Sequence, residues 1–305
     1  MRLLPRRKPA ATLTLSPGHP LRATETVTAT VLLDEPLDQV TSAWVELGYV
    51  NSFRYRWAGR RDAAANFDDG SLLTAGQVGT DHGSEKDTEE WVEALREPLV
   101  VAGGVLGAGE HRVGLRLPSW SPGSGESIVR WEVRLHVERD GRDVETTAGL
   151  QVLVAAPDPA PVLPLIQGTR VLFNTLEWDI RTERPCYRPG EEVRGTIVLT
   201  PREPVRKGNL ALTFVRTRLS HPLTRTPGSE TESFTRPYVE IVEELVLTPG
   251  VATEVPFTAV LPAEVDPTTE AVHSSLEWYV EPRVMFEGLT GGVESARRGI
   301  VVYTA

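Results

Sequence analysis

The chain has 305 residues, a formal net charge of −10, 24 prolines, 26 glycines and one cysteine. This length accommodates two domains, and the net negative charge argues against nucleic-acid binding, because phosphate backbones repel it. One cysteine cannot form an internal disulfide, and the first residues lack the apolar core of a signal peptide, so we expect a cytoplasmic protein.

Alternation of apolar and polar side chains predicts β-strands along the chain. The clearest run is Thr41–Trp57, in which every second residue is mostly apolar, and His111–Leu117 has the same period. Ile128–Val137 and Thr196–Thr200 are rich in β-branched residues, which favour strands. Ser84–Glu97 fits an amphipathic helix or a strand, and we favour the strand. The predicted fold class is therefore all-β.

Three segments recur in the same order in the two halves of the chain. Trp131 and Trp278, which belong to one recurring segment, lie 147 positions apart, a spacing that suits a duplicated domain. The matched segments are Leu21–Leu33 with Tyr187–Leu199, Leu117-Pro118 plus Ile128–Val133 with Leu261-Pro262 plus Ser275–Val280, and Gly149–Val154 with Gly299–Thr304.

The repeat predicts two domains joined by a stiff connector. We place the N-terminal domain at residues 1–156 and the C-terminal domain at residues 165–305. Residues 157–164 between them contain four prolines, which favour an extended, semi-rigid chain.

Tyr187–Leu199 has the sequence Tyr-Arg-Pro-Gly-Glu-Glu-Val-Arg-Gly-Thr-Ile-Val-Leu, which resembles the opening strand pair of arrestin-like domains. The recurring Leu-Pro and Trp-x-Val segments resemble a later strand of the same family, and the bacterial branch with the sporulation-control proteins is most similar. This resemblance implies two tandem immunoglobulin-like antiparallel β-sandwiches and a scaffold or adaptor role without catalytic residues. The Pro-Pro-x-Tyr motif and the lysine pair of eukaryotic members have no evident counterpart, so receptor-phosphate sensing is not expected.

The segment Phe53–Arg61 is the candidate partner-binding surface. In a strand its aromatic side chains share one face and its first two arginines share the other, and both residue types are enriched at interface hot spots. An ordinary strand with aromatics in the core and arginines in water is the alternative interpretation. The candidate residues are Phe53, Arg54, Tyr55, Arg56, Trp57, Arg60 and Arg61.

The patterns typical of catalytic, metal and cofactor sites do not emerge. The six histidines lack the close spacing of metal ligands. Gly103–Gly109 precedes a predicted strand, whereas a dinucleotide site needs a helix there. Cys186 has no histidine near it in sequence, and the acidic run at residues 81–90 suggests a solvated loop. We therefore predict a protein that is not an enzyme and needs no metal or cofactor.

The predicted function is a non-catalytic intracellular adaptor that presents loops and strand edges to protein partners in bacterial signalling or sporulation control. The alternative is a module that binds a small ligand or carbohydrate through Trp44, Trp57 or Trp120. Any membrane contact is expected to be peripheral, through the basic N-terminal residues. These residues are Arg2, Arg6, Arg7 and Lys8. The sequence indicates neither the partner nor the oligomeric state.

Overall fold

The structure is a computed structural model that describes residues 10–56, 85–167, 174–221, 226–227, 229–233, 238–288 and 292–305. These residues form strands β1 to β21 and no helix, which confirms the predicted all-β class. None of them therefore belongs to a helix long and apolar enough to span a membrane. The chain divides into two compact units, one of Met1–Phe53 with Thr88–Val154 and one of Arg54–Asp87 with Ala155–Ala305.

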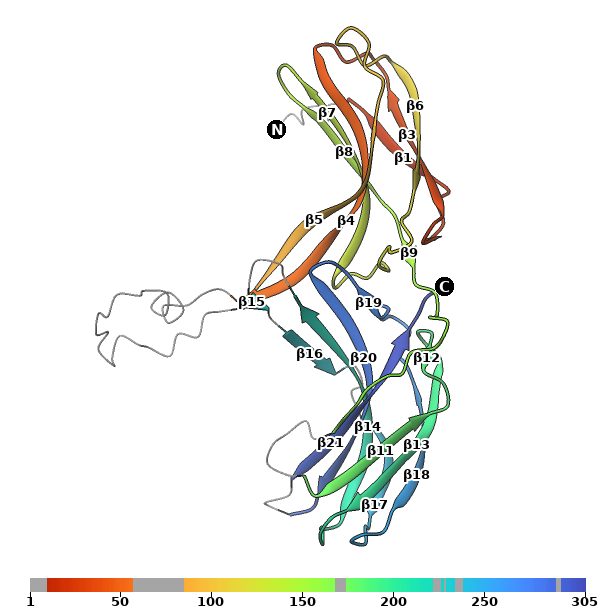
Figure 1. Cartoon of the computed structure of the whole chain (residues 1–305), viewed down its shortest axis with the longest axis vertical. Helices are drawn as coiled ribbons and strands as arrows, with labels where there is room; N and C mark the ends of the chain where they lie inside the picture. The colour runs from red at the N-terminus through yellow and green to blue at the C-terminus, as the bar shows by residue number, and fades with distance from the viewer. Residues whose placement is uncertain are drawn as a thin grey trace, which may run out of the picture. The chain divides into compact units, whose positions relative to one another are not determined.

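The first unit holds two antiparallel sheets (Figure 1). In the smaller sheet β3 lies between β1 and β6, and in the larger sheet β4 pairs with β5 and β7, while β8 pairs with β7. Every second side chain of β3 and β7 is buried, as a two-layer sandwich requires. The strands are β1 (Thr12–Ser16), β2 (Leu21–Arg22), β3 (Thr26–Leu33), β4 (Val40–Arg56), β5 (Glu85–Pro98), β6 (Gly109–Arg116), β7 (Val129–Arg139), β8 (Val144–Gly149) and β9 (Val152–Leu153).

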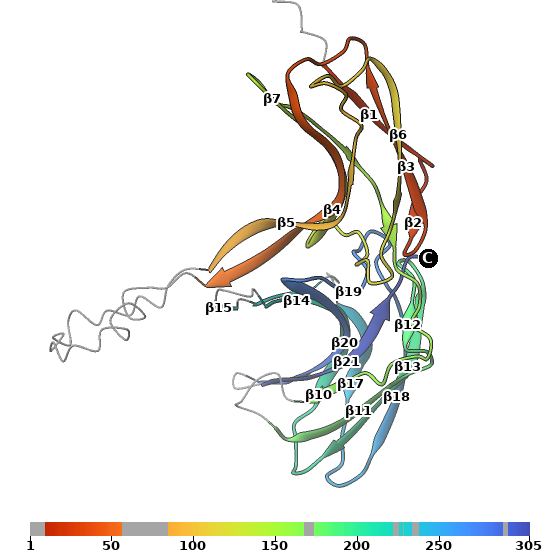
Figure 2. The same ribbon diagram turned by 45° about the horizontal axis from the view of Figure 1, so that its top comes forward.

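The second unit repeats this plan with a larger second sheet. In its smaller sheet β13 lies between β11 and β18, and in its larger sheet β20 lies between β14 and β21 (Figure 2). Side chains from both sheets form one core, which includes Trp178, Phe214 and Trp278. The strands are β10 (Leu165–Gln167), β11 (Leu176–Thr182), β12 (Cys186–Tyr187), β13 (Glu192–Pro201), β14 (Gly208–Ser220), β15 (Thr226–Pro227), β16 (Ser229–Ser233), β17 (Val239–Leu245), β18 (Thr253–Val260), β19 (Thr269–Glu270), β20 (Ser274–Phe286) and β21 (Val293–Val302).

The turn that opens the recurring segment has the same geometry in both units. Thr24 and Gly190, which the sequence match aligns, have φ angles of 73° and 79°. The Thr24 amide donates to the carbonyl of Leu117 at 3.1 Å, and the Gly190 amide donates to the carbonyl of Leu261 at 3.0 Å. The next residue in each copy is a glutamate whose carboxylate accepts from a backbone amide three positions earlier. The matched residues therefore occupy equivalent places.

Each recurring tryptophan forms a hydrogen bond with the loop that follows its Leu-Pro pair. The indole of Trp131 donates to the carbonyl of Pro122 at 2.8 Å, and the indole of Trp278 donates to the carbonyl of Asp266 at 2.9 Å. Each acceptor lies four positions after the proline of its Leu-Pro pair. Because both indoles are buried, each hydrogen bond anchors a loop to the core of its unit.

The strand interpretation of Ser84–Glu97 is confirmed by β5, and its first residues correct the expectation of a loop at 81–90, because Glu85–Glu90 is part of that strand. Asp81 lies outside the described residues. The chain between Val154 and Pro164 forms no strand. The predicted domain limits stay predictions, and the compact units differ from them in grouping residues 54–87 with the second half.

Candidate functional site

The candidate site is the outer face of the larger sheet in the first unit. Odd-numbered residues of β4 and β7, among them Leu47 and Trp131, point into the core, so the even-numbered residues point away from it. Side chains of β5 join them through direct contacts. We call this set the outer face, and its members are Trp44, Glu46 and Ser52 of β4, Glu89, Trp91 and Arg96 of β5, and Arg130, Glu132, Arg134 and His136 of β7.

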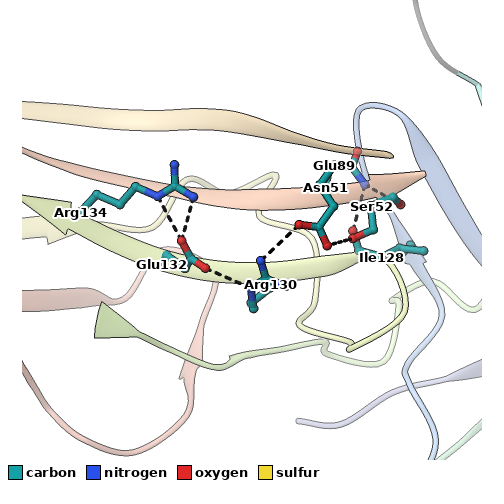
Figure 3. Close-up of polar contacts among 7 residues, drawn as sticks. All are labelled: Asn51, Ser52, Glu89, Ile128, Arg130, Glu132 and Arg134. Atoms are coloured by element: carbon teal, nitrogen blue, oxygen red, sulfur yellow. Dashed lines mark hydrogen bonds and ion pairs between the residues drawn. The ribbon is translucent and has the colours of Figure 1, made fainter. Parts of the chain in front are cut away.

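A continuous chain of polar contacts crosses the outer face from β7 to β4 (Figure 3). Arg134 bonds the carboxylate of Glu132 through Nη2 at 2.8 Å and Nε at 3.0 Å. Arg130 Nε lies 3.0 Å from the other oxygen of Glu132, and Arg130 Nη2 lies 3.5 Å from Glu89. The Ser52 hydroxyl donates to Glu89 at 3.1 Å. The charges of β5 and β7 are thus held in fixed positions.

These contacts change the ionisation of the central carboxylate. Burial raises the pKa of Glu132, but the hydrogen bonds from Arg130 and Arg134 outweigh this effect, so the pKa is lowered overall. The hydrogen bond to Glu132 raises the pKa of Arg130. Glu132 and Arg130 are therefore both charged at neutral pH.

A buried amide fixes the end of the outer face. Asn51, next to Ser52 on β4, donates from Nδ2 to the carbonyl oxygen of Ile128 at 2.9 Å (Figure 3). Asn51 also pairs with Val129, the first residue of β7. This bond ties β4 to the start of β7, directly before Arg130, and so sets the position from which that arginine extends.

The Trp91 ring packs closely against β4 because residue 48 of that strand is glycine. A Cβ atom at Gly48 would meet the Trp91 ring at 2.6 Å and would also collide with the carbonyl oxygen of Val92. Arg134 covers the indole, with its Cζ atom 3.7 Å from the ring centre. This distance is well within the range of a cation–π contact.

A second aromatic cluster lies further along the same strands. The ring of Trp44 stacks on His136 with centroids 5.2 Å apart and an interplanar angle of 15°. Arg96 Cζ lies 5.1 Å from the Trp44 ring centre. The carboxylate of Glu46 accepts from the Trp44 indole at 2.7 Å and pairs with Arg96 at 2.6 Å. Neighbouring side chains of the same unit therefore already contact the Trp44 ring.

The predicted surface at Phe53–Arg61 is only partly described. Phe53 is a core residue with 1% of its surface exposed, which corrects its place in the predicted surface, because the odd-numbered residues of β4 face inward. Arg54 and Tyr55 are half-buried, and Arg54 forms an ion pair with Asp87 at 3.3 Å. Arg56 ends β4. Trp57, Arg60 and Arg61 lie outside the described residues, as do Arg2, Arg6, Arg7 and Lys8.

The outer face was missed in the sequence because its residues come from three separate segments. Arg130, Glu132, Arg134 and His136 occupy alternate positions of a predicted strand, and this pattern was a usable signal. The contact of this row with β5 could not be read from sequence.

The second unit has a shallow depression of about 350 Å³ near the start of β13. Its arginines are paired with carboxylates of the same lining, Arg184 with Glu191 at 3.3 Å and Arg194 with Glu192. Cys186 is half-buried nearby in sequence, and burial raises the pKa of its thiol, which disfavours the thiolate form. Across the described residues, no group of three or more His, Cys, Asp or Glu side chains could hold a metal ion.

No protein-family model and no curated protein matches this chain. Among solved structures, the chain is similar to the crystal structure of Spo0M, a sporulation control protein from Bacillus subtilis. The two are 21% identical, the match covers 44% of this chain and 51% of that protein, and the TM-score is 0.33. The chain thus spans about half the length of that protein. So distant a likeness carries no argument about function.

Proposed function

We propose that the chain is a non-catalytic, arrestin-like adaptor that binds protein partners through the outer face of its first unit. The observation that supports this proposal is the gathering of Trp44, Trp91 and three arginines on adjacent strands of one sheet. Tryptophan and arginine are the residue types most enriched at interface hot spots. An intracellular role in bacterial signalling or sporulation control is part of the proposal.

The arrangement suits binding because the side chains are ordered before a partner arrives. Arg134 is held by Glu132 and by the ring of Trp91, and Arg96 is held by Glu46. Ordering flexible arginines on binding costs free energy, and preorganisation lowers that cost. Arg130 keeps 56% of its side chain exposed, so it is available to a partner.

In the experiment, the full chain and its variants serve as baits in a native lysate, and the proteins that each captures are compared quantitatively. We expect the variant Trp91→Ala/Arg134→Ala to lose partners that the unchanged chain retains. The matched control is Arg112→Ala, which removes an exposed, ion-paired arginine from β6 in the other sheet and should retain them. Circular dichroism checks that each variant is folded. Identical partner sets for all three proteins, or none for the unchanged chain, contradict the proposal.

A carbohydrate-binding module is the second candidate, because Trp120 is 55% exposed in the loop between β6 and β7. Exposed aromatic rings of this kind stack on sugars. Trp44 supports this candidate less, since His136 and Arg96 contact its ring. A glycan array would favour this function if it gave a signal that the variant Trp120→Ala loses, and a flat array contradicts it.

A further inference from the structure

Strand β5 forms a long edge of the larger sheet in the first unit. It is 14 residues long, and within the described part of the chain it pairs with β4 and with no other strand. Figure 2 shows β5 beside β4. The other described edge strands of this unit are shorter: β1 has 5 residues, β6 has 8 and β8 has 6. The second edge of β5 therefore offers backbone groups for pairing with a further strand.

The side chains of β5 determine what kind of strand can pair there. From Thr88 to Pro98 the strand carries four glutamates and one arginine, a net charge of −3. The side chains of Glu89 and Glu93 are 54% and 40% exposed. Charged edge strands resist pairing with arbitrary chains, because like charges on an incoming strand repel and carboxylates are costly to desolvate. A strand with cations at the facing positions meets neither penalty.

We propose that β5 accepts an extended, lysine- and arginine-rich segment of the partner protein by strand addition. This inference rests on the proposed function and names the partner's chemistry. Backbone hydrogen bonds along β5 supply affinity, and the carboxylates select the charge. The added strand lies next to Trp91 and extends the sheet whose outer face the partner contacts.

The test uses three synthetic peptides with the full chain. The first is about ten residues long, enough to pair along most of β5, and alternates lysine with threonine or valine. The second has glutamate in place of lysine. The third keeps every lysine but carries N-methyl groups on alternate amides, which removes donors that strand pairing needs. Fluorescence anisotropy measures binding at about 0.15 M salt, where long-range attraction is screened.

We expect the first peptide alone to bind and to slow amide hydrogen exchange in β5. Equal binding of the N-methylated peptide would mean plain charge attraction and overturns strand addition. Binding of the glutamate peptide overturns the predicted charge selection. Failure of the first peptide to bind overturns the whole inference.

Variants of the chain give a second, independent readout. Glu89→Lys/Glu93→Lys should weaken the binding of the lysine peptide about tenfold or more, since two attractions become repulsions. The control Glu35→Lys/Glu110→Lys changes the net charge equally on exposed residues away from β5 and should bind as the unchanged chain does. Glu89→Gln/Glu93→Gln, which keeps the shape of both side chains, should bind with intermediate strength. Equal weakening by the control overturns the assignment to β5.

The same variants separate this inference from the proposed function. If Glu89→Lys/Glu93→Lys still captures the partners that Trp91→Ala/Arg134→Ala loses, strand addition at β5 is wrong while the adaptor function stands. If neither variant changes the captured proteins, the adaptor function through this face is wrong as well.

Discussion

Substitutions at the aligned positions of the two recurring turns test the equivalence of the units. Gly190 has a φ of 79°, in the left-handed region, and a Cβ atom there would meet the Cβ of Ala263 at 3.7 Å, an ordinary contact. Gly190→Ala therefore adds a backbone cost of roughly 1–2 kcal/mol without a collision. Lower entropy of the unfolded chain offsets part of this, so we expect a loss of about 1 kcal/mol in unfolding free energy.

Thr24 is the aligned residue of the first unit, and it holds a φ of 73° with a β-branched side chain. Thr24→Gly removes this strain, so we expect the unfolding free energy to rise by roughly 0.5–1 kcal/mol. Urea unfolding of the full chain, followed by circular dichroism, measures both changes. The control is Gly18→Ala, which has open space around it and no left-handed φ, and it should be close to neutral. The reasoning is refuted if Gly190→Ala is neutral or if Thr24→Gly destabilises.

Three further predictions concern buried side chains. Trp131→Phe and Trp278→Phe should each lower the unfolding free energy by about 2–4 kcal/mol, because a backbone carbonyl loses its donor and a cavity forms; a loss below about 0.5 kcal/mol in urea unfolding contradicts this. Gly48→Ala should cost about 2 kcal/mol or more, because its Cβ collides with Trp91, and an unchanged melting temperature contradicts this. Burial, followed by the hydrogen bond to Glu277, raises the pKa of Tyr279 well above the usual value of 10.0. The unfolded chain then releases this proton first as pH rises, so stability should fall above about pH 10. Burial also raises the pKa of Tyr187, so an ultraviolet titration should show two tyrosines ionising late; uniform ionisation of all tyrosines contradicts this.

The framework of the fold was predictable because it follows local rules. Alternation placed β4 and β7, and the Pro189-Gly190 turn marked the entry to β13 because proline and glycine favour its backbone angles. The match between the halves also predicted equivalent contacts. Leu21 pairs in parallel with Val152, and the residues aligned with these two, Tyr187 and Val302, form the equivalent parallel pair in the second unit.

The candidate site was harder to predict because it depends on strand register. Alternation placed the apolar face of β4, with Phe53, in the core, but it does not say which side chains of other strands contact Trp44 on the opposite face. Those contacts depend on the partner strands. Trp44 pairs across β4 and β7 with His136, and this long-range register brings the two rings together. Nothing local in either segment encodes that contact.

Comparison of the two copies explains why we assign partner binding to the first unit. At an offset of 147 positions, the core residues Trp131 and Val133 align with Trp278 and Val280, whereas the outward residue between them changes from Glu132 to Tyr279. Arg134, on the outer face, aligns with Glu281, which is 1% exposed and paired with two arginines of its own unit. Removing one partner of such a buried ion pair is costly. Arg130 on the outer face keeps 56% of its side chain exposed, whereas Arg283 and Arg297 beside Glu281 keep 24% and 20%, so the first unit leaves an outward charge more accessible to another protein.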